Sequence, residues 1–228
     1  MAGIYIIFIF FTIISWLVSS RLKSKFREYS AINLPNNMSG QEIAEKMLRE
    51  HGIYDVKVIS TPGELTDHYN PLTKTVNLSH EVFYGRHISS AAVAAHECGH
   101  AVQHADAYQW LNMRSRLVPI VNFSSGIMQW VLLAGILTIQ VFPALLLIGI
   151  LMFALTTLFS LITLPVEFDA SNRAIKWLNN TGTLMGTHLN KAQNALNWAA
   201  STYVIAALSS LATLMYYVMI YLGGRRND

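Results

Sequence analysis

The sequence predicts a mainly α-helical membrane protein with four transmembrane helices and a small α+β domain. Hydrophobic residues make up 53% of its 228 residues and charged residues only 13%, whereas soluble domains contain about 25% charged residues. No charged residue occurs between Arg116 and Glu167. A polar stretch between the first two apolar runs contains short alternating segments that are typical of strands. This pattern favours a membrane protein that also carries a folded polar domain.

The first apolar segment, residues 2–20, is long enough to cross a hydrocarbon core of about 30 Å. No basic residue precedes it, which favours an uncleaved anchor over a cleaved signal peptide. Four basic residues follow it, namely Arg21, Lys23, Lys25 and Arg27. By the positive-inside rule they hold the downstream side in the cytoplasm, with the N-terminus outside.

The polar segment is predicted to contain one helix and three strands. Ser39 and Glu42 form a capping-box pattern at the start of the helix. Its apolar face comprises Ile43, Ala44, Met47 and Leu48. The first strand is expected over residues 55–60, and two more are expected to flank a turn at Asn70 and Pro71.

The charge-free run before Glu167 would form about 75 Å of helix at 1.5 Å per residue, which is enough for two crossings. We expect spans over residues 118–139 and 144–164, joined by a turn at residues 140–143. Such a hairpin returns the chain to the side of the membrane that it left, which is predicted to be the cytoplasmic side.

After the hairpin, Pro165 is expected to open a new helix that ends near residue 178. Residues 191–198 are predicted to form a separate amphipathic helix, and residues 203–222 the last span. The predicted parts are an anchor (1–20), the N-terminal part of the polar domain (21–116), a transmembrane hairpin (117–165), a helix-bearing segment (166–200) and a last transmembrane helix (201–224).

The chemistry is concentrated in His96, Glu97 and His100, within an alanine-rich helix that Ser89 or Ser90 could cap. Histidines four residues apart share one helix face, so both imidazoles can bind one metal ion. The neighbouring Glu97 can then take a proton from a metal-bound water. This pattern is typical of zinc hydrolases and predicts a zincin-like domain. The alternative is a metal-free helix whose histidines make local hydrogen bonds.

A catalytic zinc site needs a third protein ligand. We expect it to be Glu167, on a second helix after the membrane hairpin, so that each chain holds one Zn²⁺. The alternatives are Asp106, six residues after the second histidine, and a Glu167 that only caps a helix N-terminus. Asp169 is expected to pair with Arg173 or to support a ligand histidine.

Several segments resemble the YugP-type membrane zinc metallopeptidases of bacteria, in order and over the whole chain. They are residues 65–71, 76–79, 94–103, 114–115, 117–119, 164–171 and 199–204. The resemblance implies a neutral zinc protease of the plasma membrane. The chain is more distantly similar to HtpX-type quality-control proteases, whose third ligand is a Glu on a later helix, as Glu167 is here. Those proteases place Asp four residues after that Glu, where this chain has Ser171, so Asp169 is expected to supply the acidic support.

The expected activity is hydrolysis of peptide bonds in membrane or misfolded proteins at the cytoplasmic face, with Glu97 activating the zinc-bound water. Tyr203 or His188 is expected to stabilise the oxyanion. An exposed edge strand is expected to pair with extended substrate. Its residues are Thr75, Val76, Asn77 and Leu78. The expected partners are a protein or peptide substrate and the lipid bilayer. The net charge of +3 does not indicate nucleic acid, and the oligomeric state is left open.

Two other functions remain as alternatives. A site-2-type intramembrane protease would place the motif helix inside the bilayer, which the nearby polar residues Glu97, His104 and Asp106 disfavour. A non-catalytic membrane scaffold would instead keep zinc for structure.

Overall fold

A computed structural model describes residues 2–224, which divide into two compact units. The first unit contains residues 2–17, 112–164 and 202–224, and the second contains residues 18–111 and 165–201. Four long helices contribute residues to both units. The five-part division drawn from the sequence stays a prediction.

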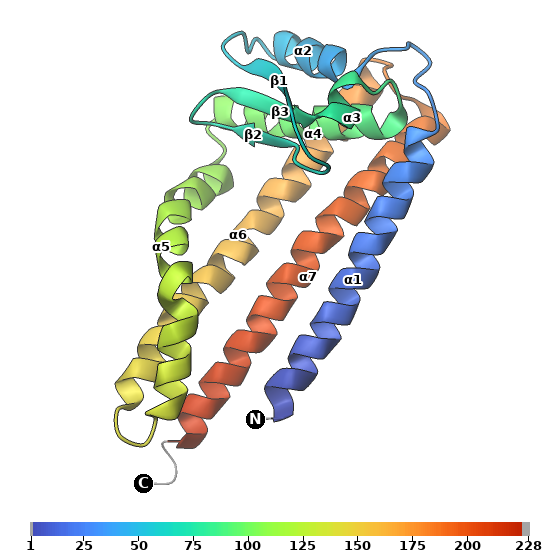
Figure 1. Cartoon of the computed structure of the whole chain (residues 1–228). Helices are drawn as coiled ribbons and strands as arrows, with labels where there is room; N and C mark the ends of the chain where they lie inside the picture. Colours follow the sequence, from blue (N-terminus) through green and yellow to red (C-terminus); the bar gives the residue numbers. More distant parts are fainter. Residues whose placement is uncertain (1, 225–228) are drawn as a thin grey trace. The chain divides into compact units, whose positions relative to one another are not determined.

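Within residues 2–224, four helices are long and apolar enough to cross a membrane, as expected from the sequence. They are α1 (Ala2–Ser30), α5 (Gln109–Leu137), α6 (Pro143–Asn180) and α7 (Gly186–Gly224) (Figure 1). The predicted turn at residues 140–143 is confirmed, because α5 ends at Leu137 and α6 begins at Pro143.

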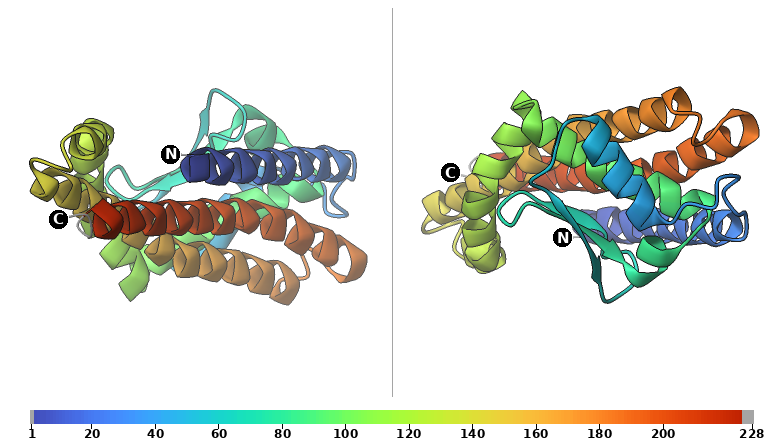
Figure 2. Two further views of the ribbon diagram at one scale, coloured as in Figure 1. Left: turned by 90° about the horizontal axis from the view of Figure 1, so that it is seen from below. Right: turned by 90° about the horizontal axis from the view of Figure 1, so that it is seen from above.

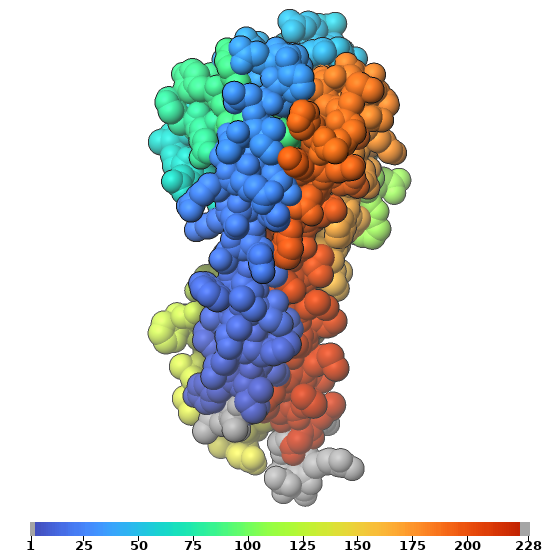
Figure 3. Space-filling model, turned by 90° about the vertical axis from the view of Figure 1, so that its right-hand side faces the viewer, coloured from blue at the N-terminus to red at the C-terminus, as the bar shows by residue number. Residues whose placement is uncertain are grey.

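Within the first unit, α5 and α6 approach closely, since a Cβ on Gly135 would lie 2.5 Å from the Cα of Leu146. The hydroxyls of Thr157 on α6 and Ser210 on α7 lie 2.7 Å apart. Helices α1 and α7 lie side by side in this unit (Figure 3), where a Cβ on Gly3 would meet the ring of Tyr216 at 3.1 Å.

Two expected helix boundaries are wrong. Pro165 lies inside the continuous helix α6, and residues 191–198 belong to the continuous helix α7. Proline removes one backbone donor, yet long apolar helices tolerate it where packing and side chains compensate.

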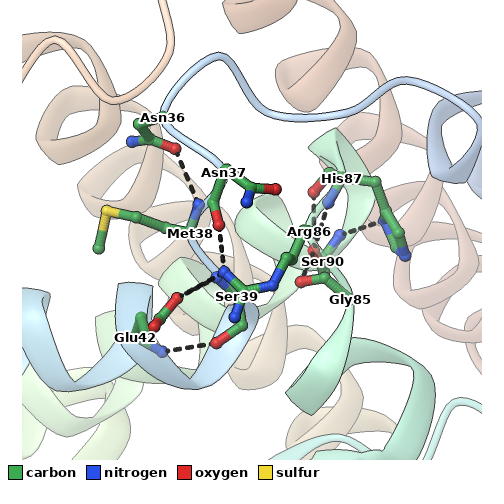
Figure 4. Close-up of polar contacts among 9 residues, drawn as sticks. All are labelled: Asn36, Asn37, Met38, Ser39, Glu42, Gly85, Arg86, His87 and Ser90. Atoms are coloured by element: carbon green, nitrogen blue, oxygen red, sulfur yellow. Dashed lines mark hydrogen bonds and ion pairs between the residues drawn. The ribbon is translucent and has the colours of Figure 1, made fainter.

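The second unit contains a well-capped helix, α2 (Gly40–Glu50). The predicted capping box is confirmed. The N–H of Glu42 donates to the Ser39 hydroxyl at 3.2 Å, and the N–H of Ser39 donates to the Glu42 carboxylate at 2.6 Å (Figure 4). The Arg86 guanidinium also bonds to Glu42 at 3.1 Å and to the carbonyl of Asn37.

The three-stranded sheet has the order β1 (Lys57–Thr61), β3 (Thr75–Ser79), β2 (His68–Asn70). Strand β3 is central, parallel to β1 and antiparallel to β2. The expectation that β3 forms an exposed edge is therefore wrong, because β1 occupies the side that the hairpin leaves open. The residues concerned are Thr75, Val76, Asn77 and Leu78, of which the last three are buried. The edge strands are β1 and β2.

The helix of the histidine motif, α4 (Ile88–Ala105), begins differently from what the sequence suggested. A short helix, α3 (His80–Tyr84), separates it from the sheet. His87, rather than Ser89 or Ser90, is the N-cap. Its Nδ1 accepts from the N–H of Ser90 at 3.1 Å, and its own N–H donates to the Ser90 hydroxyl at 3.2 Å (Figure 4). An imidazole thus performs the role that short polar side chains usually have.

Helix α4 is the centre of the second unit. The helix lies against α2, α3 and the sheet (Figures 1 and 2). Five of its alanines are buried in one core with residues of α2 and β3, namely Ala91, Ala92, Ala94, Ala95 and Ala101. Helix α6 meets it at Gly99, where an added Cβ would lie 2.6 Å from the carbonyl oxygen of Ala170. Only glycine at position 99 allows this approach of the two backbones.

Replacing Gly99 with alanine is expected to lower the free energy of unfolding by about 1–3 kcal/mol, because backbone atoms must move to admit the methyl group. Gly126→Ala on α5 is the matched control, since nothing lies within 4 Å of the added Cβ. That control should be neutral or slightly stabilising, because alanine is the better helix former. Thermal unfolding followed by circular dichroism in detergent measures both. Equal melting temperatures would contradict the close approach.

Candidate metal centre

Two histidines from α4 and one carboxylate from α6 converge in the second unit. The Oε2 of Glu167 lies 3.4 Å from the Nε2 of His96 and 3.6 Å from the Nε2 of His100. One ligand atom from each residue lies within 4.8 Å of the other two. The Glu167 side chain is only 3% exposed. The three residues expected from the sequence to bind metal are thus brought together.

The donor set fits zinc. Two imidazole nitrogens and one carboxylate oxygen are a combination found in catalytic zinc sites, where a fourth position is left for water or substrate. Imidazole also favours zinc over magnesium or calcium, which prefer oxygen ligands alone. Burial of a carboxylate between two imidazoles costs solvation energy that a bound cation would offset.

The opposite nitrogen of each imidazole is hydrogen-bonded. The Nδ1 of His96 lies 3.0 Å from the hydroxyl of Ser171, and the Nδ1 of His100 lies 3.0 Å from the Oε1 of Gln103. Both rings are thereby oriented with Nε2 toward Glu167. Such partners commonly fix the orientation of metal-binding histidines.

Asp169 contacts neither histidine directly. It pairs with Arg173 at 2.6 Å, as the i,i+4 spacing predicted, and accepts a hydrogen bond from Gln103 at 2.8 Å. Asp106, the alternative third ligand, is at the end of α4 and pairs with Arg173 at 2.5 Å. The side chain that bonds to Nδ1 of His96 is the neutral Ser171 rather than an acid.

Glu97 lies beside the cluster and is 8% exposed. Its carboxylate accepts a hydrogen bond from the backbone N–H of Tyr69 at 3.0 Å. Because β2 is an edge strand, this N–H is not needed for the sheet. Burial raises the pKa of Glu97 to about 7, partly opposed by the charge of His96. A carboxyl group with a pKa near neutrality is suited to accept and return a proton.

Two other residues were expected from the sequence to stabilise the oxyanion. Tyr203 belongs to the first unit and is 38% exposed. His188 lies in the first turn of α7 and is partly exposed. Their suggested role at the oxyanion stays a prediction. His104 forms a 2.7 Å hydrogen bond through Nδ1 with the hydroxyl of Tyr69.

Three supporting residues were missed or undervalued in the sequence. Gln103 could have been found, because it follows His100 by three residues and therefore shares its helix face. Ser171 follows Glu167 by four residues and shares its helix face. In the sequence, Ser171 was noted only as a replacement for an Asp, and its hydroxyl was not considered as a partner for a histidine. Tyr69 gave no signal, because it acts through its backbone N–H.

A family model described as "Putative neutral zinc metallopeptidase" matches residues 4–222. The chain is also 42% identical over 223 residues to a Bacillus subtilis (strain 168) protein named "Putative membrane protease YugP". That alignment covers 96% of this chain and 98% of the relative. No solved structure matches the chain. Since the family model spans nearly the whole sequence, the cluster included, the chain belongs to the family that this model describes.

Proposed function

We propose that the protein is a zinc-dependent membrane endopeptidase with a zincin-like catalytic domain. His96, His100 and Glu167 would hold one zinc ion per chain. The observation that carries the proposal is the convergence of these side chains, with their ligand atoms within 4.8 Å of one another, next to a buried Glu97. Three protein ligands, rather than four, are typical of a catalytic zinc site and not of a structural one.

Zinc, when bound, would supply a Lewis acid for peptide hydrolysis. Glu97 would accept a proton from the attacking water as the water oxygen bonds to the peptide carbonyl carbon. The same carboxyl group would then give the proton to the leaving amine as the C–N bond breaks. The N–H of Tyr69 holds the Glu97 carboxylate in place for both steps.

The proposed substrates are membrane or misfolded proteins, cleaved at the cytoplasmic face of the plasma membrane. The basic residues after the first apolar segment support this orientation. An intramembrane protease is less well supported, because α4 is not among the four helices with the length and hydropathy of a membrane span. The buried Glu97, directly after the proposed ligand His96, favours an enzyme over a zinc-stabilised scaffold, because a structural site needs no such carboxylate.

Glu97→Gln should leave zinc content unchanged and lower casein cleavage by the detergent-purified protein about 10²–10⁴-fold, because proton transfer is lost. Glu64→Gln makes the same chemical change at an exposed position and should cleave normally. Chelator should stop cleavage by the unaltered protein. The enzyme proposal would be rejected if the Glu97 variant cleaved as fast as the unaltered protein with equal metal content.

Glu167→Gln should weaken zinc binding by at least about 100-fold, more than is typical for a residue that only supports a ligand. The amide keeps the shape of the side chain and removes the anionic oxygen. Competition with a chromophoric chelator measures the affinity, with Glu64→Gln as the control. Unchanged affinity in a folded Glu167 variant would remove this residue from the ligand set.

Cysteine at position 72 tests the orientation. Leu72 is 94% exposed at the turn between β2 and β3, and the single native cysteine, Cys98, is fully buried. A membrane-impermeant maleimide should label Leu72→Cys only after cells are permeabilised. Labelling of intact cells would place the catalytic unit outside.

A further inference from the structure

The side chain of Gln103 is fully buried and connects α4 to α6. Its Oε1 lies 3.0 Å from the Nδ1 of His100. Its Nε2 donates to the carbonyl of Val166 and to the carboxylate of Asp169, both at 2.8 Å. The side-chain amide of Gln103 therefore links His100, a proposed zinc ligand on α4, to the backbone carbonyl of Val166 on α6. Val166 directly precedes Glu167, the proposed ligand on that helix.

The orientation of this amide has only one solution. A backbone carbonyl and a carboxylate accept hydrogen bonds and cannot donate them. The NH₂ group of Gln103 must face Val166 and Asp169, and both of its hydrogens are used there. The flipped amide would place its oxygen against two acceptors in a buried site, at a high cost in free energy. The Oε1 atom must therefore face His100.

The proton on His100 follows from that orientation. Because Oε1 can only accept, the Nδ1 of His100 must carry the hydrogen of the bond between them. The Nε2 atom, which faces Glu167 at 3.6 Å, is then the only nitrogen of this ring that can bind a metal ion.

We propose that Gln103 is a positioning residue that keeps Nδ1 of His100 protonated and directs Nε2 into the zinc site. This inference rests on the proposed zinc site and identifies which residue prepares its second histidine. Gln103 touches neither substrate nor metal, and it acts through His100.

The two histidines are not supported equally. The hydroxyl of Ser171 can donate to His96 or accept from it, so it orients the ring without selecting the proton position. Gln103 does both for His100. Loss of Gln103 should therefore weaken zinc binding more than loss of the Ser171 hydroxyl.

The support of Gln103 extends outward. Arg173 holds Asp169 at 2.6 Å and Asp106 at 2.5 Å. The Asp106 side chain is 57% exposed, and exposed ion pairs contribute little to the free energy of folding. Asp106→Asn is therefore a suitable control, because it alters the outer end of the same chain of contacts without touching Gln103 or Asp169.

The test uses full-length protein in detergent with four variants. Gln103→Met removes the amide at similar volume, and Gln103→Glu keeps an oxygen that accepts from Nδ1–H. Ser171→Ala removes the hydroxyl that bonds to His96, so its effect can be compared with the loss of Gln103. Asp106→Asn is the control. Zinc affinity is measured by chelator competition. The ring protons are observed by NMR of zinc-loaded protein labelled with ¹⁵N-histidine. The signals of His100 are assigned as those that disappear in a further variant, His100→Gln.

We expect zinc bound through Nε2 of His100 and a slowly exchanging Nδ1–H. Gln103→Met should lose that slow exchange and bind zinc about 10–100-fold more weakly, as is typical for a residue supporting a metal ligand. Gln103→Glu should keep the slow exchange, because one oxygen still accepts from Nδ1–H. It should restore the affinity only in part, since its other oxygen would face the acceptors of Val166 and Asp169. Ser171→Ala should lose less affinity than Gln103→Met, and Asp106→Asn should match the unaltered protein.

Three results would overturn the inference. They are metal binding through Nδ1 of His100, full affinity in a folded Gln103→Met protein, and an equal loss in Asp106→Asn. If Gln103→Met does not fold, the NMR spectrum of the unaltered protein still decides which nitrogen binds. Neither readout uses cleavage, so failure of this inference is distinct from failure of the protease proposal.

Discussion

The approach of α6 to α4 is the constraint on which the site depends. The two backbones approach closely at Gly99, where a side chain would collide with the carbonyl oxygen of Ala170. Gly99 lies between Glu97 and His100, and Ala170 lies one turn after Glu167. The contact therefore brings the carboxylate of α6 to the imidazoles of α4. A glycine inside the motif is required by packing, independently of the chemistry of its neighbours.

The site is costly to build without a cation. Glu167 and Glu97 are both nearly buried, and burial of a carboxylate must be compensated by hydrogen bonds or opposite charge. Tyr69 supplies a backbone N–H to Glu97, while the imidazoles of His96 and His100 face Glu167. The negative charge of Glu167 adds to the burial that raises the pKa of Glu97. Such a shift is common where a fold places acids for proton transfer.

Local sequence patterns predicted much of this structure. The capping box at Ser39, the four apolar helices and the turn before Pro143 are short-range features, and each is found as expected. The grouping of His96 and His100 follows from helix periodicity alone. Glu167 was expected near the histidines because a hairpin of two membrane spans returns the chain to the side that it left. That inference depends on the number of crossings and not on a local pattern around Glu167.

The features that were missed depend on contacts between distant segments. The central position of β3 depends on β1 pairing with it in parallel, which no turn signal between them reveals. Pro165 did not end a helix, because a long helix can tolerate the loss of one donor. The cap at His87 and the backbone donor of Tyr69 require the folded arrangement, since neither residue type marks such a role in a sequence.

The ligand set is tested most directly by zinc X-ray absorption on the purified protein. The account predicts a four-coordinate ion with two imidazoles, Zn–N distances of about 2.0–2.1 Å and oxygen as the remaining donors. It also predicts a changed spectrum when Glu167 is replaced by Gln. A sulfur ligand, the absence of imidazole scattering, or an unchanged spectrum in that variant would contradict it.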